Sequence, residues 1–301
     1  MKLLNEYLNG NVTVEIYSDG TKKRAFAGKP FPIHPESIDV KITDFCDAKC
    51  SYCHEKSTML GEHGDLGKLK EVLQPLPPGV ELAIGGGNPL SHPDLIPFLI
   101  WCKEKGLIAN ITVNQKHIEQ YQTLILDLIE KDLIKGLGIS YSSENYLKFI
   151  SSLLQKTNNL VFHVIMGINS VEDIEKLHDF CNEQNKVCKI LILGYKHFGF
   201  GINYYLRNLK IEDNKYQWYT QLFNYFKEED LILSFDNLGI EQLNLQRFFT
   251  KESWETFYMG DDFTFTMYID AVKQEFAHSS TSLNRVSFSE ISLFDYFQNK
   301  A

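Results

Sequence analysis

The chain has 301 residues, which is enough for one large domain or for a domain with an appendage. Hydrophobic residues make up 44% of the sequence and aromatic residues 13%, so we expect a sizeable core and exclude disorder over most of the chain. The net charge of -9 argues against a broad surface for nucleic acid or for a membrane.

The apolar runs and the N-terminal residues give no sign of membrane insertion or export. The starting sequence Met-Lys-Leu-Leu-Asn-Glu-Tyr lacks the uninterrupted apolar stretch of a signal peptide. The longest apolar run, residues 95–102, is interrupted by Pro97 and is far too short to span a bilayer. We therefore expect a cytoplasmic protein.

Residues 1–36 are expected to form an N-terminal β-hairpin and a linker. Apolar and polar residues alternate from Val12 to Ile16, the turn formers Ser18 to Gly20 follow, and residues 22–26 return as the second strand. Three prolines between residues 30 and 35 then predict an extended linker.

Over residues 37–229, six strand-like runs alternate with helical patterns. The runs lie at residues 38–43, 80–85, 108–113, 136–141, 160–167 and 187–194. Most are rich in Ile, Val and Leu, as parallel strands covered by helices are. Helix starts between them are indicated by the suitable N-cap residues Asp65, Asp94, Ser143 and Ser170. The alternation predicts an α/β domain with a parallel sheet.

Three cysteines, Cys46, Cys50 and Cys53, lie on one short loop after the first of these strands. A loop this short directs their side chains to one metal centre, and thiolates select zinc, copper(I) or iron–sulfur clusters. An ordinary iron–sulfur cluster takes four cysteines. Because no fourth lies nearby, we predict a 4Fe–4S cluster with one iron left without a protein ligand. The alternative is a structural zinc site made by these cysteines and a histidine.

The other three cysteines, Cys102, Cys181 and Cys188, fall within helical or strand patterns and are interpreted as small core residues. The six cysteines therefore do not form a disulfide framework, which agrees with a reducing cytosol.

The spacing C-x3-C-x-aromatic-C, with Tyr52 as the aromatic residue, resembles the signature of the radical S-adenosylmethionine (SAM) enzymes. The resemblance implies a partial (β/α)6 barrel of the TIM-like kind. It also implies one 4Fe–4S cluster on the three cysteines, whose open iron binds SAM. In that family the reduced cluster cleaves SAM to a 5′-deoxyadenosyl radical, which abstracts hydrogen from the substrate.

The resemblance also assigns SAM contacts to motifs at strand ends, where barrel enzymes collect their functional groups. The run from Gly85 to Pro89 resembles the Gly-Gly-Glu-Pro motif that binds the amino group of SAM, with Asn88 in place of the Glu. An amide oxygen can also accept a hydrogen bond. The candidate cofactor-binding residues are Tyr52, Gly86, Gly87, Asn88, Asn114, Ser140 and Tyr195. The alternative roles are tight turns and the capping of strand ends.

His163 lies on the fifth strand-like run among apolar neighbours. It could point into the barrel or could be an ordinary core or surface histidine. No catalytic residue is assigned from the sequence.

Residues 230–301 are expected to form a small α+β extension. Its expected elements are a strand at 231–235, a helix at 246–257, strand pairs within 263–277 and a closing helix at 291–297. This layout resembles the extension of the SPASM and twitch group, whose members carry auxiliary iron–sulfur clusters. No cysteine follows Cys188, so an auxiliary cluster cannot be built and the resemblance is to a cysteine-less version.

The leading prediction is a radical SAM enzyme with a single cluster, acting on a peptide. A nucleoside or another small metabolite is the alternative substrate. A non-enzymatic zinc or iron–sulfur protein, such as a redox sensor, is the alternative of another class, but it leaves the glycine run without a purpose. The chemistry implies an electron donor of the flavodoxin or ferredoxin type.

Overall fold

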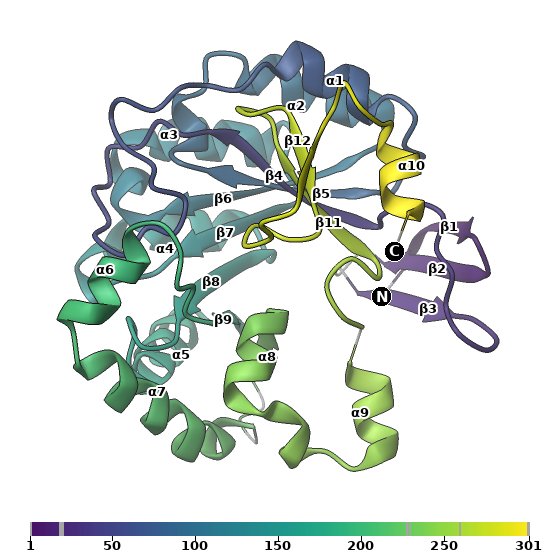
Figure 1. The fold of residues 1–301 in the computed structure, drawn as a ribbon. Coiled ribbons are helices and arrows are strands. Elements are labelled where there is room, and N and C mark those ends of the chain that lie inside the picture. Colours follow the sequence, from purple (N-terminus) through teal and green to yellow (C-terminus); the bar gives the residue numbers. More distant parts are fainter. Residues whose placement is uncertain (1, 18–20, 227, 229, 259, 300–301) are drawn as a thin grey trace.

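A computed structural model describes residues 2–17, 21–226, 228, 230–258 and 260–299. Its main feature is a ten-stranded sheet with the strand order β10-β9-β8-β7-β6-β5-β4-β11-β12-β13 (Figure 1). Neighbouring strands from β10 to β11 are parallel, and β12 and β13 continue the sheet in antiparallel pairs. The protein therefore has a mixed α/β fold with a large parallel sheet, as the sequence predicts.

The six strands expected between residues 37 and 229 are present as β4 to β9. Each strand begins and ends within two residues of the expected positions. The strands of the large sheet are β4 (Ser37–Thr43), β5 (Glu81–Gly86), β6 (Ile108–Asn114), β7 (Gly136–Ser140), β8 (Leu160–Ile165), β9 (Cys188–Leu193), β10 (Leu231–Phe235), β11 (Thr266–Asp270), β12 (Glu275–Ala277) and β13 (Arg285–Ser287).

Helices connect successive parallel strands, and Figure 1 shows α1 to α5 along one side of the sheet. The α-helices are α1 (Leu66–Leu73), α2 (Leu95–Lys105), α3 (Ile118–Glu130), α4 (Leu147–Lys156), α5 (Asp173–Glu183), α6 (Phe200–Arg207), α7 (Lys210–Gln221), α8 (Asn237–Leu243), α9 (Lys251–Phe257) and α10 (Leu293–Gln298). The 3₁₀ helices are η1 (Pro89–Ser91), η2 (Gln115–His117), η3 (Glu144–Tyr146), η4 (Leu222–Tyr225) and η5 (Leu245–Phe248).

Two of the predicted helix starts are confirmed by capping contacts. The side chain of Asp65 accepts a backbone N–H at the start of α1, and that of Ser143 does so at the start of η3. Asp94 precedes α2 but makes no side-chain capping bond. Ser170 is followed by a turn of two residues before α5 begins. Its own N–H donates to the carboxylate of Asp173 at 3.1 Å, which is one half of a capping box at this helix start.

The two faces of the parallel sheet are buried to different extents. In β6, β8 and β9 a fully buried residue alternates with a partly buried one. The buried side chains, such as Ile111 and Ile190, belong to the core that the helices cover. The opposite face carries polar side chains such as Asn110 and Thr112, which are only partly buried. Side chains on this second face are therefore partly accessible.

The N-terminal region is a three-stranded antiparallel sheet and not a hairpin alone. The expected hairpin is present as β2 (Val12–Tyr17) and β3 (Lys22–Ala25), and β1 (Leu3–Asn9) pairs with β2. The turn expected at residues 18–20 lies outside the described residues. The strand β1 is not predicted because its sequence shows no clear alternation of apolar and polar residues. Leu3 and Leu8 of this strand are 43% and 69% exposed.

The C-terminal region adds strands beside both β9 and β4. The predicted strand at 231–235 is β10, which is parallel to β9, and the predicted strand pair is β11 with β12. The closing helix is confirmed as α10, which lies near the N-terminal sheet in Figure 1. The single helix expected at 246–257 is wrong, because Thr250 forms a capping box that starts a separate helix, α9, after η5.

In the part of the chain that the structure describes, no helix combines the length and the apolar character that crossing a bilayer requires.

Candidate metal and cofactor site

The segment after β4, residues 44–55, carries the three clustered cysteines and is named the cysteine segment. Cys46, Cys50 and Cys53 are free thiols of intermediate exposure, and all three line one cavity of about 120 Å³. Predicted site residues that share this lining are Gly86, Gly87, Asn114 and Ser140. The fold thus brings together the cysteine loop, the glycine run and the carboxyl ends of β6 and β7, which the sequence placed in one site.

Backbone hydrogen bonds hold the cysteine segment from two sides. The N–H of Cys46 donates to the carbonyl of Thr58 at 2.9 Å. On the other side, the N–H of Phe200 at the start of α6 donates to the carbonyl of Cys53 at 2.9 Å. The first residue of α6 is therefore in direct contact with the cysteine segment.

The glycine run after β5 packs directly against the cysteine segment. The N–H of Gly87 donates to the carbonyl of Thr43, and the N–H of Asn88 donates to that of Phe45, each at 2.7 Å. Gly86 has a φ of +111°, and a Cβ there would lie 2.5 Å from the carbonyl oxygen of Thr43. Because no side chain fits this approach, packing alone requires a glycine at this position.

Asn88 is fully buried at the end of the glycine run. Its amide nitrogen lies 3.4 Å from Oδ1 of Asp47. Its amide oxygen has no hydrogen-bond partner among the described residues. Leaving a buried acceptor unpaired costs free energy. Unlike Gly86 and Gly87, however, Asn88 does not belong to the lining of the cysteine cavity.

Asn114 and Ser140 end the neighbouring strands β6 and β7 and are paired in register. The amide nitrogen of Asn114 donates to Sγ of Cys50 at 3.4 Å. Asn114 therefore contacts a cysteine of the loop directly, which the sequence does not predict.

Tyr52 and Tyr195 lie in the lining of a second cavity of about 40 Å³, together with His54 and Lys196. The hydroxyl of Tyr195 donates to the carbonyl of Gly201 at 2.7 Å, so this group is already paired within the protein. The structure brings these two predicted cofactor residues together, but in a cavity other than the one that the cysteines line.

Side chains from η2, directly after β6, also contact the cysteine segment. Nε2 of His117 lies 2.8 Å from Oδ1 of Asp47, and Nζ of Lys116 donates to the carbonyl of Ala48 at 3.0 Å. Sequence reasoning missed these residues, although their position immediately after a predicted strand end was a usable signal.

The electrostatics of the site affect how readily the thiols ionise. Burial raises the pKa of the Cys46 and Cys50 thiols, and the nearby Lys116 ammonium acts against this rise at Cys50. Metals bind the thiolate form. The ammonium of Lys116 therefore favours the form of Cys50 that a metal centre needs.

The spacing of the possible ligands bears on the kind of metal group that fits. Ligand atoms of Cys46, Asp47 and His117 all lie within 4.8 Å of one another, whereas among the described residues the three cysteine sulfurs form no group this compact. Tetrahedral zinc with Zn–S bonds of about 2.3 Å holds its sulfur ligands only about 3.8 Å apart. Cys46, Cys50 and Cys53 nevertheless share the lining of one cavity, so a metal group in that cavity could take all three as ligands.

Comparison with known proteins shows what this α/β fold is similar to. No family model and no curated protein matches the chain. Among solved structures, it is similar to SuiB of Streptococcus suis bound to S-adenosylmethionine (TM-score 0.64), bound to the precursor peptide SuiA (0.62), and in a third crystal structure (0.60).

The sequence identity to SuiB is 15% in each case, and the match covers 89% of this chain. It covers 67%, 66% and 67% of the three SuiB chains, so this chain spans about two thirds of their length. At this identity, the similarity is one of fold.

Proposed function

We propose that the protein is a radical SAM enzyme that holds one 4Fe–4S cluster on Cys46, Cys50 and Cys53 and binds SAM beside it. The main support is the single cavity that the three free cysteines share with the glycine run and with the ends of β6 and β7. The similar fold of SuiB, which has been solved with SAM bound, adds to this support.

When bound, the cluster and SAM together supply a one-electron cleavage that yields a radical able to abstract hydrogen from a substrate. The residues of this chain hold and orient these groups. Gly85, Gly86 and Gly87 line the cavity and would hold SAM there, and Asn88, which follows them outside the lining, would accept a hydrogen bond from the amino group of SAM with its unpaired amide oxygen. Asn114 donates a hydrogen bond to the sulfur of Cys50, and such bonds tune the reduction potential of a cluster.

A structural zinc site is the second candidate, favoured by the compact group of Cys46, Asp47 and His117. It leaves Cys50 and Cys53 without a role, although both line the same cavity as Cys46. The cluster accounts for all three cysteines and is the preferred assignment.

For the substrate, we propose a peptide, because SuiB has been solved with the precursor peptide SuiA bound. A nucleoside or another small metabolite is the alternative. Cleavage of SAM consumes an electron, so the enzyme would need a donor of the flavodoxin or ferredoxin type.

The test is anaerobic reconstitution with iron and sulfide, followed by reduction and addition of SAM. We expect the wild type to bind about four irons per chain and to form 5′-deoxyadenosine, detected by mass spectrometry. Cys50→Ala should lose both properties. Cys102→Ala, which removes a buried thiol in α2, is the matched control and should keep both.

Zinc in place of iron, with no SAM bound or cleaved, would refute the proposal. An iron-loaded wild type that binds SAM without cleaving it would support the cofactor assignment and would show that cleavage requires the substrate.

A further inference from the structure

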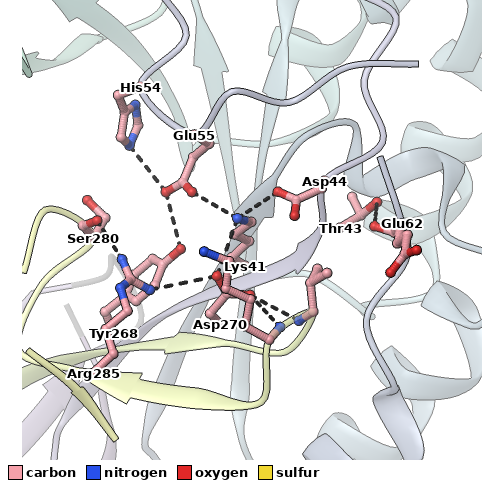
Figure 2. Close-up of polar contacts among 12 residues, drawn as sticks. Lys41, Thr43, Asp44, His54, Glu55, Glu62, Tyr268, Asp270, Ser280 and Arg285 are labelled. Carbon is pink, nitrogen blue, oxygen red and sulfur yellow. Dashed lines mark hydrogen bonds and ion pairs between the residues drawn. The ribbon is translucent and has the colours of Figure 1, made fainter. Parts of the chain in front are cut away.

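Lys41 lies on β4 shortly before the cysteine segment, and its side chain is only 5% exposed. Its ammonium contacts three carboxylates, at 2.6 Å from Asp44, 3.1 Å from Glu55 and 3.3 Å from Asp270. Figure 2 shows Lys41 at the centre of this group.

Two of these carboxylates mark the ends of the cysteine segment. Asp44 precedes Cys46 by two residues, and Glu55 follows Cys53 by two residues. Because one ammonium contacts both carboxylates, Lys41 joins the two ends of the segment that carries the cysteines.

The third carboxylate comes from the C-terminal region. Asp270 ends β11, is paired in register with Lys41, and has a side chain only 1% exposed. Arg285 of β13 lies 3.7 Å from the same carboxylate, and the hydroxyl of Tyr268 donates to Glu55 at 3.2 Å (Figure 2). The cysteine-free C-terminal region therefore contacts the cysteine segment both directly, at Glu55, and through Lys41.

The charges of this group depend on one another. Burial disfavours the ammonium of Lys41, but the carboxylates of Glu55, Asp270 and Asp44 more than offset this, so its pKa is raised above the usual value. Removing one partner of a buried ion pair leaves an uncompensated charge and is strongly destabilising. Without the Lys41 charge, Glu55 and Asp270 would repel each other, and the cysteine segment would lose its tie to β11.

We propose that Lys41 is a positioning residue that fixes both ends of the cysteine segment against Asp270, which makes the C-terminal region a part of the metal site. The metal part of this inference rests on the proposed function. The positioning part concerns the chain alone and can be measured without any metal.

If Lys41 only stabilised the fold in general, removing another buried ion pair would have the same effect on the cysteine segment. The chain offers such a pair as a matched control. Lys22 of β3 lies 3.3 Å from Glu81 at the amino end of β5, and its side chain is 10% exposed. Lys22→Met therefore removes a largely buried ion pair at the amino ends of β4 and β5, whereas the cysteine segment follows the carboxyl end of β4.

The experiment compares Lys41→Met, Asp270→Asn and Lys22→Met with the wild type. Asp270→Asn keeps an oxygen for the backbone N–H groups of Val272 and Lys273, which Oδ1 accepts at 3.0 Å each, so it offers a milder variant if Lys41→Met does not fold. Two quantities are measured: amide hydrogen exchange over residues 45–62 in the metal-free protein, and the rate at which a chelator removes iron after reconstitution.

We expect Lys41→Met to speed both exchange and iron loss by about tenfold or more, and Asp270→Asn to act in the same direction. Lys22→Met should change neither in these residues. If both test variants match Lys22→Met, the positioning role is wrong. Faster exchange without faster iron loss would overturn the link to the metal site. A wild type that binds no iron would refute the proposed function, while the exchange data would still decide the role of Lys41.

Discussion

At the scale of single residues, His163 shows how the neighbours of a side chain determine its charge. It is paired in register with Ser140, and a Cβ added at Gly138 would lie 2.7 Å from its Nε2. The ring therefore occupies space that a glycine on the next strand leaves free. Burial lowers the pKa of His163 to about 4, so the ring is uncharged at neutral pH.

This pKa predicts a dependence of stability on pH. In the unfolded chain a histidine has a pKa of about 6.5, so between about pH 6.5 and pH 4 the unfolded state binds a proton that the folded state excludes. The stabilisation is fully present above this window and is lost as the pH falls through it. Between pH 7 and pH 5, we expect His163 to account for a loss of about 1–2 kcal/mol.

Urea unfolding of the metal-free protein at both pH values is the measurement. His163→Gln should lose correspondingly less stability than the wild type over this range. Equal losses would show that the proton uptake occurs at other groups.

At the scale of elements, two different roles can explain the glycines in the turn from β5 into η1. The sequence suggests a cofactor-binding motif there, and the structure adds that the turn packs on the backbone of the cysteine segment. A glycine triplet in a sequence does not by itself distinguish these roles, because both require backbone without side chains.

Gly86→Ala should destabilise the metal-free protein by about 2 kcal/mol or more. The new Cβ would combine an unfavourable positive φ with a contact 2.5 Å from a backbone oxygen. Gly28→Ala is the matched control, because Gly28 also has a positive φ, of +72°, but an added Cβ meets nothing within 4 Å. It should cost only about 1 kcal/mol. If urea unfolding shows similar losses of stability for both variants, the close contact of Gly86 with the Thr43 carbonyl does not add to the cost of an alanine there.

At the scale of the whole molecule, the C-terminal region is paired with the same sheet as residues 37–229. β10 is paired with β9, and β11 is paired with β4. We propose residue 229 as the boundary between the main α/β domain and an extension, but the pairing predicts that the two regions depend on each other.

A fragment of residues 37–229 should therefore fail to unfold cooperatively. It would lose the strands beside β4 and β9, together with core side chains such as Met267, Ile269 and Phe276. Urea unfolding followed by circular dichroism, compared with the full chain, is the measurement. A cooperative transition in the fragment would show instead that residues 37–229 fold on their own.

The strands β4 to β9 could be predicted because each is a distinct run rich in apolar residues between helical patterns. The missed elements β1, α8 and β13 are short or lack a clear apolar period, so local sequence carries little information about them. Similarly, the register that places Asn114 beside Ser140 follows from the strand order, whereas the bond from Asn114 to Cys50 joins residues far apart in the chain.

The sequence by itself determined the α/β class, the three cysteines on one loop and the glycine run that follows the next strand, because spacing and periodicity are properties of neighbouring residues. Only the tertiary structure decided that these parts share one cavity and that Tyr52 and Tyr195 line another. The contact between Lys41 and Asp270 likewise comes only from the tertiary structure, because it depends on the pairing of β11 with β4. Such a pairing joins residues that are distant in the chain, and no local pattern encodes it.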